Sequence, residues 1–209
     1  MELKEVLPMD IEKRSMEIIG EELGEVQLDP DKASIVKRVI HTSADFDYAR
    51  NLRFSEGVVA QALAVLQQGA TIVTDTKMAC VGINKPGLRK LGGQAVCFMD
   101  DPEVAAHAKA VGSTRAAACM EKAAALPGPL IIAIGNAPTA LVKLDELVRA
   151  GKIKPALVIG VPVGFVNVVE AKELIMQTGI PYIVAVGRKG GSNVAAAICN
   201  ALIYKLTRK

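Results

Sequence analysis

Short apolar segments rich in β-branched residues alternate with helical segments along most of the chain. The apolar segments lie at residues 71–75, 95–99, 130–134, 156–160 and 182–186. They are nearly continuous in apolar residues, which is typical of strands that are buried on both faces. Helical patterns occupy residues 103–126, 139–150, 167–178 and 192–206, whereas residues 77–94 are less regular. The alternation predicts an α/β protein with one parallel sheet.

Three more helices are expected before the first strand. The first opens at Pro8-Met9-Asp10 and ends near Gly24, and the second begins at Asp29-Pro30 with an acidic cap. The third runs from Ser55, its N-cap candidate, to Gly69. We therefore expect a three-layer, flavodoxin-like, doubly wound parallel sheet of five strands with additional N-terminal helices.

Composition and charge narrow the possible functions. The 209 residues include three tyrosines, four phenylalanines and no tryptophan, which disfavours a base-stacking nucleic-acid platform. The net charge is +3 and the basic residues are scattered, so we expect no nucleic-acid partner. The apolar runs are too short to span a membrane, and the N-terminus lacks a signal-peptide pattern. We expect a single cytoplasmic domain over residues 1–209 with no membrane partner.

Familiar metal and nucleotide motifs are missing from the sequence. The four cysteines and two histidines show no metal-ligand spacing, so we expect no metal site. Cys97 and Cys199 lie within apolar runs, where a reduced thiol packs as a small apolar side chain. Neither a P-loop nor a dinucleotide-binding glycine motif occurs, so these motifs give no support for nucleotide binding.

Polar residues concentrate in the segments that follow the predicted strands. These segments are residues 75–77, 135–139, 160–164 and 187–192. The carboxyl ends of parallel strands share one edge of the sheet, where ligands bind in such folds. Segment 187–192 is rich in glycine and basic residues and opens a helix, which indicates an anion site. A tight turn with a solvated basic tip is the alternative.

His41 is the candidate proton donor. It ends the second predicted helix, and Arg38 lies three residues earlier on the same face. A neighbouring cation disfavours the imidazolium, although a histidine at a helix C-terminus is also common for dipole reasons alone. His107 lies in an alanine-rich helix, where a packed or exposed side chain is expected. A proton donor among cationic residues suits the acid-assisted rearrangement of an anionic substrate.

Six groups of residues, in order along nearly the whole chain, resemble the precorrin-8X methylmutase family. They are residues 41–49 with 52–55, 73–78 with 82–83, 114–118, 135–141, 163–170 and 187–192. The resemblance implies a flavodoxin-like homodimer that has no cofactor of its own and binds an anionic tetrapyrrole. It also implies an isomerase of cobalamin biosynthesis that moves a methyl group from C11 to C12 of precorrin-8X or cobalt-precorrin-8, giving hydrogenobyrinic or cobyrinic acid.

The same resemblance assigns roles to individual residues. The family's catalytic histidine matches His41, and its substrate contacts match Ser15 and Arg38. The candidate substrate contacts are Arg14, Ser15, Arg38, Thr76, Arg115, Arg188, Lys189, Gly190 and Ser192. These residues do not indicate whether the substrate carries cobalt.

Two other functions stay open on the sequence alone. A non-catalytic carrier of corrinoid intermediates would use the same carboxylate contacts but would not need His41. A sugar-phosphate or nucleotide binder would use segment 187–192, although the missing fingerprints disfavour it.

Overall fold

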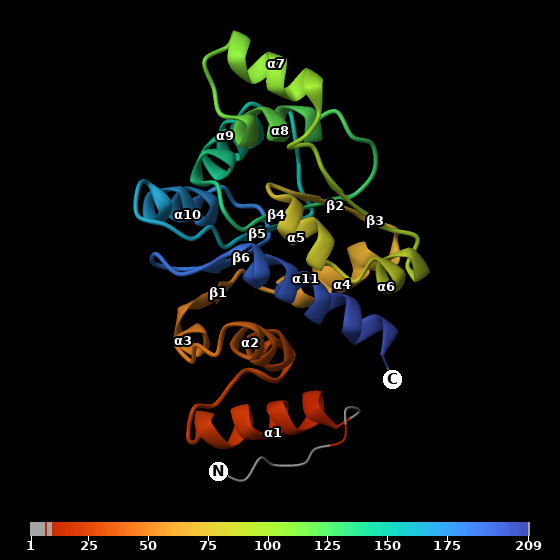
Figure 1. Cartoon of the computed structure of the whole chain (residues 1–209), viewed down its shortest axis with the longest axis vertical. Helices are drawn as coiled ribbons and strands as arrows, with labels where there is room; N and C mark the ends of the chain where they lie inside the picture. Colours follow the sequence, from red (N-terminus) through yellow and green to blue (C-terminus); the bar gives the residue numbers. More distant parts are fainter. Residues whose placement is uncertain (1–6, 8–9, 209) are drawn as a thin grey trace.

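A six-stranded sheet with helices on both faces forms the centre of the protein (Figure 1). The computed structural model describes residues 7 and 10–208. Five strands are parallel: β2 (Thr71–Thr74), β3 (Gln94–Cys97), β4 (Leu130–Ile134), β5 (Leu157–Gly160) and β6 (Tyr182–Ala185). The full order is β1-β6-β5-β4-β2-β3, so the parallel strands follow the predicted flavodoxin-like order.

The prediction of five strands was wrong by one edge strand. β1 (Leu52–Phe54) pairs antiparallel with β6. A three-residue strand is too short to show an alternating pattern, and Arg53 within it is exposed. The Oγ of Ser55 accepts a hydrogen bond from the Tyr182 N–H at 3.0 Å, so Ser55 extends this edge pairing and is not the predicted helix cap. Gly57 is the N-cap of the helix that follows.

The helices form two layers around the sheet. The hydrophobic core on one face includes residues of α1 (Ile11–Leu23), α2 (Pro30–Ser43), α3 (Tyr48–Asn51), α4 (Val58–Gln67), α5 (Lys77–Gly82), α6 (Lys85–Lys90) and α11 (Ser192–Thr207). The core on the other face includes residues of α7 (Pro102–Ala110), α8 (Arg115–Ala123), α9 (Pro138–Arg149) and α10 (Val168–Gln177). In β4, Ile131 and Ala133 face the first core, whereas Ile132 and Ile134 face the second. Both faces are buried, as the continuous apolar strands predict.

Helix boundaries follow the local capping chemistry. The single helix predicted over 103–126 is two helices, because the chain turns at Gly112 and Thr114 caps α8 by accepting a hydrogen bond from the Ala117 N–H at 3.2 Å. The irregular segment 77–94 contains the short helices α5 and α6. Asp29 caps α2 as predicted. Pro8 and Met9, where the first helix was expected to open, lie outside the described residues.

The N-terminal helices stack outward from the sheet. In Figure 1, α1 is the outermost helix and α2 lies between it and the rest of the molecule. α2 packs on α11, whose residues 194–199 are all buried. Within the described part of the chain, no helix combines the length and the apolar character needed to cross a bilayer. Helix α2 thus covers α11 on one face of the sheet, and α1 in turn covers α2.

Most of the cysteines lie in the interior of the fold. All four are free thiols, and Cys80, Cys119 and Cys199 are buried. Burial raises the pKa of Cys119 to about 11 and the pKa of Cys199 to about 12. Thiols that stay protonated are poor nucleophiles. Cys199 is buried in the apolar core, as predicted, whereas Cys97 is only partly buried.

One buried carboxylate joins the ends of two central strands. Asp75 directly follows β2, and it accepts hydrogen bonds from the backbone N–H groups of Gly135, Asn136 and Ala137 after β4, at 2.8, 2.8 and 2.7 Å. Its side chain is almost inaccessible to solvent, and burial raises its pKa while the three donors oppose that shift. β2 and β4 flank the point where the strand order reverses, which is where doubly wound folds bind ligands. In this chain, an internal carboxylate takes that place.

Replacing Asp75 tests how much the fold depends on this junction. Asp75→Ala leaves three N–H groups without their acceptor, so we expect the free energy of unfolding to fall by about 3 kcal/mol or more. Urea unfolding followed by circular dichroism measures the change. The control Glu173→Ala, at an exposed position of α10, should change stability by about 0.5 kcal/mol or less. Equal effects of the two substitutions would contradict the prediction.

Candidate active site

His41 lies in the last turn of α2 and borders two cavities. The first cavity, of about 320 Å³, lies between α2, α5 and α11; the second, of about 330 Å³, lies between α1 and the end of α2. Among the residues that the structure describes, His41 is the one that lines both. The imidazole is exposed, and it has no hydrogen-bond partner among the residues that the structure describes. Its ring nitrogens are therefore free to exchange a proton with a bound molecule.

The chain leaves α2 sharply after His41. Ala44 caps the helix in the left-handed conformation, with φ of 52°, and its N–H donates to the carbonyl of Ile40 at 2.7 Å. This conformation is costly for a residue other than glycine and is held by its surroundings. The helix end, and with it the position of His41, depends on what fixes the following segment.

The first cavity places a cation beside His41. Arg38 lines this cavity, hydrogen-bonds to Glu12 of α1, and stacks on the ring of Tyr204 at 5.1 Å from the centroid. The Arg38 hydrogen bond lowers the pKa of the Glu12 carboxyl. Arg208 also binds Glu12, at 2.8 Å. The expected proximity of Arg38 and His41 is present, with Arg38 already paired to a carboxylate.

The second cavity brings Ser15 close to His41. It is lined mainly by apolar side chains, with Ser15 and Glu22 as its other polar residues besides His41. The Ser15 Oγ donates to the carbonyl of Ile11 at 2.8 Å within α1. Arg14 instead pairs with Glu17 and Glu21 on its own helix, at 3.1 and 3.3 Å, and lines neither cavity.

Thr76 and Ser192 meet at the carboxyl edge of the sheet. Their hydroxyl oxygens are 2.7 Å apart. Thr76 also caps α5, while Ser192 opens α11. Met78 and Asn193, two residues after Thr76 and one after Ser192, line the first cavity. The pair therefore joins the two helices that form one wall of that cavity.

The loop at residues 187–191 packs tightly against the loop after β5. A side-chain carbon on Gly190 would lie only 2.1 Å from the carbonyl oxygen of Val161, so this close backbone approach requires glycine. The Gly191 N–H donates to the same oxygen at 2.9 Å. The Gly164 N–H donates to the carbonyl of Arg188 at 3.1 Å. Gly190 thus has a structural reason to be glycine that is independent of any substrate.

Lys189 connects this loop to the segment that follows His41. Its Nζ lies 2.7 Å from an Asp45 oxygen and 2.6 Å from an Asp47 oxygen. Hydrogen bonds to these two carboxylates raise the pKa of Lys189 above its ordinary value. Lys189 therefore pairs within the protein, although sequence analysis assigned it to substrate.

Two further candidate contacts lie away from His41. Arg115 is the exposed first residue of α8, on the opposite face of the sheet from α2. The Arg188 guanidinium lies 5.6 Å from the ring centroid of Phe165, a side chain that is 82% exposed. Neither arginine lines the cavities beside His41.

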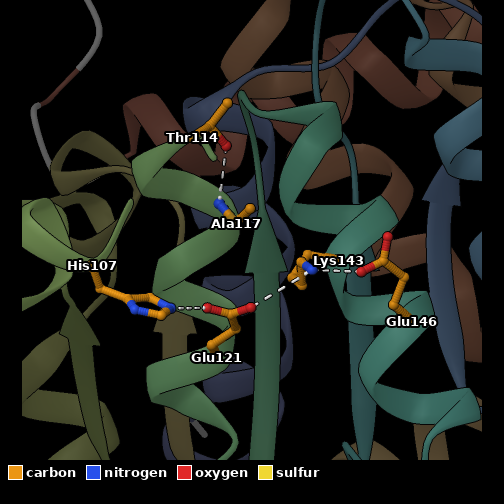
Figure 2. A network of polar contacts seen from close by, with 6 residues as sticks. All are labelled: His107, Thr114, Ala117, Glu121, Lys143 and Glu146. Atoms are coloured by element: carbon orange, nitrogen blue, oxygen red, sulfur yellow. Dashed lines mark hydrogen bonds and ion pairs between the residues drawn. The ribbon is translucent and has the colours of Figure 1, made fainter. Parts of the chain in front are cut away.

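His107 belongs to a surface network on the other face. Its side chain points toward Glu121 of α8, and Glu121 also faces Lys143 of α9 (Figure 2). The His107 Nε2 lies 2.7 Å from a Glu121 oxygen, and the Lys143 Nζ lies 3.6 Å from the other Glu121 oxygen. Lys143 in turn binds Glu146 at 2.5 Å. This contact explains His107 as a link between helices, as expected of an exposed helical histidine. Across residues 10–208, no three His, Cys, Asp or Glu side chains gather into a candidate metal cluster.

Sequence analysis missed one buried cation, Lys172 of α10. It is 1% exposed, and its Nζ donates to the carbonyl oxygens of Gly187 at 2.7 Å and Lys189 at 2.9 Å. Burial lowers its pKa to about 8. Val168, Ala171, Lys172 and Ile175 follow the spacing of an apolar helical stripe. A lysine at such a position is the signal that could have identified it.

The chain matches one protein family over most of its length. The family model described as precorrin-8X methylmutase matches residues 10–205. The chain belongs to the precorrin-8X methylmutase family. It is therefore an isomerase of the intramolecular methyl-transfer type, in cobalamin biosynthesis, and the resemblance noted in the sequence is confirmed.

Individual members of the precorrin-8X methylmutase family are similar to this chain over more than nine tenths of its length. Cobalt-precorrin-8 methylmutase of Priestia megaterium is 42% identical over 197 residues, which cover 94% of this chain and 88% of the relative. Precorrin-8X methylmutase of Pseudomonas aeruginosa is 38% identical over 194 residues, covering 92% and 93%. The crystal structure of precorrin-8x methyl mutase from Thermus thermophilus has a TM-score of 0.84 at 42% identity and covers 93% of this chain and 96% of that one.

The buried ammonium makes stability depend on pH in a defined direction. The folded protein releases the Lys172 proton near pH 8, whereas the unfolded chain keeps it to about 10.5. Between these values the unfolded chain binds more protons, so the Lys172 contribution to stability rises with pH, by up to about 3 kcal/mol. We expect the stability of the wild type relative to Lys172→Met, measured by urea unfolding, to increase from about pH 8 to about pH 10. A difference that is constant with pH would contradict this.

Proposed function

We propose that the chain moves a methyl group from C11 to C12 of a precorrin-8 macrocycle, with His41 as the proton donor. The supporting observation is the exposed imidazole of His41, which borders two cavities and has Arg38 beside it. In the proposed reaction, His41 protonates the macrocycle and the methyl group migrates as a suprafacial 1,5-sigmatropic shift. Loss of a proton from the macrocycle to His41 then restores both the neutral ring system and the acid.

This chemistry fits the residues around His41. A sigmatropic shift needs no nucleophile, and a proton on the macrocycle biases its π-system. Imidazole is suited to donating and regaining a proton near neutral pH. Positioned general acid–base groups typically accelerate reactions by about 10²–10⁴-fold. The acceleration that the mechanism attributes to His41 therefore lies within the range of ordinary general acid–base catalysis.

In this proposal, partly buried polar side chains in and next to the cavities bind the polyanionic macrocycle. Arg38 would exchange Glu12 for a substrate carboxylate, and Ser15 would donate its hydroxyl from the second cavity. Thr76 and Ser192 supply a hydroxyl pair next to the first cavity. Arg14, Arg115, Arg188, Lys189 and Gly190 remain candidate contacts, but their observed partners give them other roles in the unbound protein.

The similarity among relatives favours a cobalt-containing substrate. Of the Priestia and Pseudomonas relatives, the more similar one carries the cobalt-precorrin-8 name. We infer that kcat/KM is higher with cobalt-precorrin-8 than with precorrin-8X, which a side-by-side assay decides.

We also infer that the chain works in the cytoplasm and forms a single domain over residues 1–209. Cell fractionation tests the location, and a single cooperative unfolding transition tests the single domain.

Substitution of the two histidines tests the acid. His41→Ala should lower kcat by about 10²–10⁴-fold because the proton donor is lost. Substrate affinity, measured by equilibrium titration of the tetrapyrrole absorption, should change little. The control His107→Ala removes a histidine on the opposite face and should keep near wild-type turnover. Turnover of His41→Ala near the wild-type rate would refute the assignment, and a wild type that binds but never converts the substrate would indicate a carrier.

We infer a homodimer as the working form. Three apolar side chains of the loop after β5 are strongly exposed: Val163 at 45%, Phe165 at 82% and Val166 at 77%. Contact with a second copy would remove this apolar patch from water. Light scattering should give about twice the chain mass of 22.0 kDa. Phe165→Glu should shift the protein toward monomer, and a wild-type monomer at all concentrations would contradict the inference.

A further inference from the structure

The proposed mechanism makes no use of Lys172, yet this residue holds the loop beside the site. Its ammonium is buried and donates to the carbonyl oxygens of Gly187 and Lys189. Among the described residues, no carboxylate forms an ion pair with it. Since an uncompensated buried charge costs several kcal/mol, the two carbonyls must stay in place for the ammonium to be tolerated. The lysine thereby restricts the conformation of the 187–191 loop.

The loop is also held from its other side. Gly190 packs directly on the backbone of Val161, and the carbonyl of Arg188 accepts a hydrogen bond from the Gly164 N–H. The backbone of Lys189 is thus enclosed between α10 and the loop after β5. The Lys189 side chain therefore extends from a backbone position that is held in place.

The side chain of Lys189 carries this restriction to the end of α2. It binds Asp45 and Asp47, which follow His41 by four and six residues. An exposed ion pair by itself contributes little to stability, largely because two flexible side chains must be ordered. Here the backbone of the lysine is already anchored, so less freedom is lost. The Lys189 hydrogen bond also lowers the pKa of Asp45, which keeps this carboxylate charged.

We propose that Lys172 is a positioning residue for His41, acting through the 187–191 loop and the contacts of Lys189 with Asp45 and Asp47. Lys172 lines neither cavity beside His41, so it acts only through other residues. The link to the position of His41 is structural and stands without the reaction. Its effect on turnover rests on the proposed function.

The imidazole signals of the protein report this link directly. The chain has two histidines, so proton NMR shows two imidazole side chains, and His107→Asn assigns them. In Lys172→Met the His41 signals should shift while those of His107 stay in place. Lys172→Arg keeps a cation with donors and should shift them less. The control Lys154→Met, at an exposed lysine, should move neither set. His41 signals that coincide with the wild type in Lys172→Met would overturn the proposal.

A second variant covers the case in which Lys172→Met does not fold. Lys189→Met removes an exposed ammonium and leaves the buried one intact. It should shift the His41 signals in the same direction, because the contacts with Asp45 and Asp47 are lost. Unchanged His41 signals in Lys189→Met would overturn the second half of the proposed link.

Kinetics separate this inference from the proposed function. Displacement of the acid should lower kcat by about tenfold or more in Lys172→Met with a smaller effect on KM, and Lys172→Arg should restore part of it. A shift of the His41 signals without loss of turnover supports the positioning and contradicts His41 as the acid. Loss of turnover without a shift overturns the positioning and leaves the acid assignment standing.

Discussion

The three hydrogen bonds that Asp75 accepts fix the edge of the sheet on which the site is built. They join the end of β2 to the turn after β4, on either side of the point where the strand order reverses. The next residue, Thr76, bonds to Ser192 at the start of α11. The turn itself packs so closely that a side-chain carbon on Gly135 would lie 2.6 Å from the Ser192 Cα. The placement of α11 therefore depends on this junction, and α2, which carries His41, packs on α11.

The Asp75 junction also occupies the position at which many doubly wound folds bind an anionic ligand. In doubly wound folds, a ligand anion commonly binds the free N–H groups at the start of a helix near the switch point. Here Asp75 accepts hydrogen bonds from the N–H groups of the turn just before α9, so an anion bound to that turn would meet a buried carboxylate. The cavities at His41 lie instead between helices on one face, where α1 and α2 add walls that the sheet alone does not provide. The additional N-terminal helices thus supply walls of both cavities.

The sequence predicted those features that local patterns control. Buried parallel strands, the acidic cap of α2 and the shared helix face of Arg38 and His41 depend on residues near one another in the chain. Strand β1 was not predicted, because its pairing with β6 depends on residues far away in the sequence. The partners of long charged side chains could not be predicted either. Lys189 binds Asp45 and Arg208 binds Glu12, because each cation pairs with a carboxylate that the fold brings from a distant part of the chain.

Two buried ions of opposite sign organise the backbone of the site without meeting each other. Asp75 is surrounded by N–H donors and Lys172 by carbonyl acceptors, so each charge is compensated by peptide dipoles. Such compensation is directional, since each dipole must point at the charge, and it therefore fixes loop geometry more strictly than an apolar contact does. The loops that hold these internal ions are separate from the first cavity, where Arg38 lies beside His41.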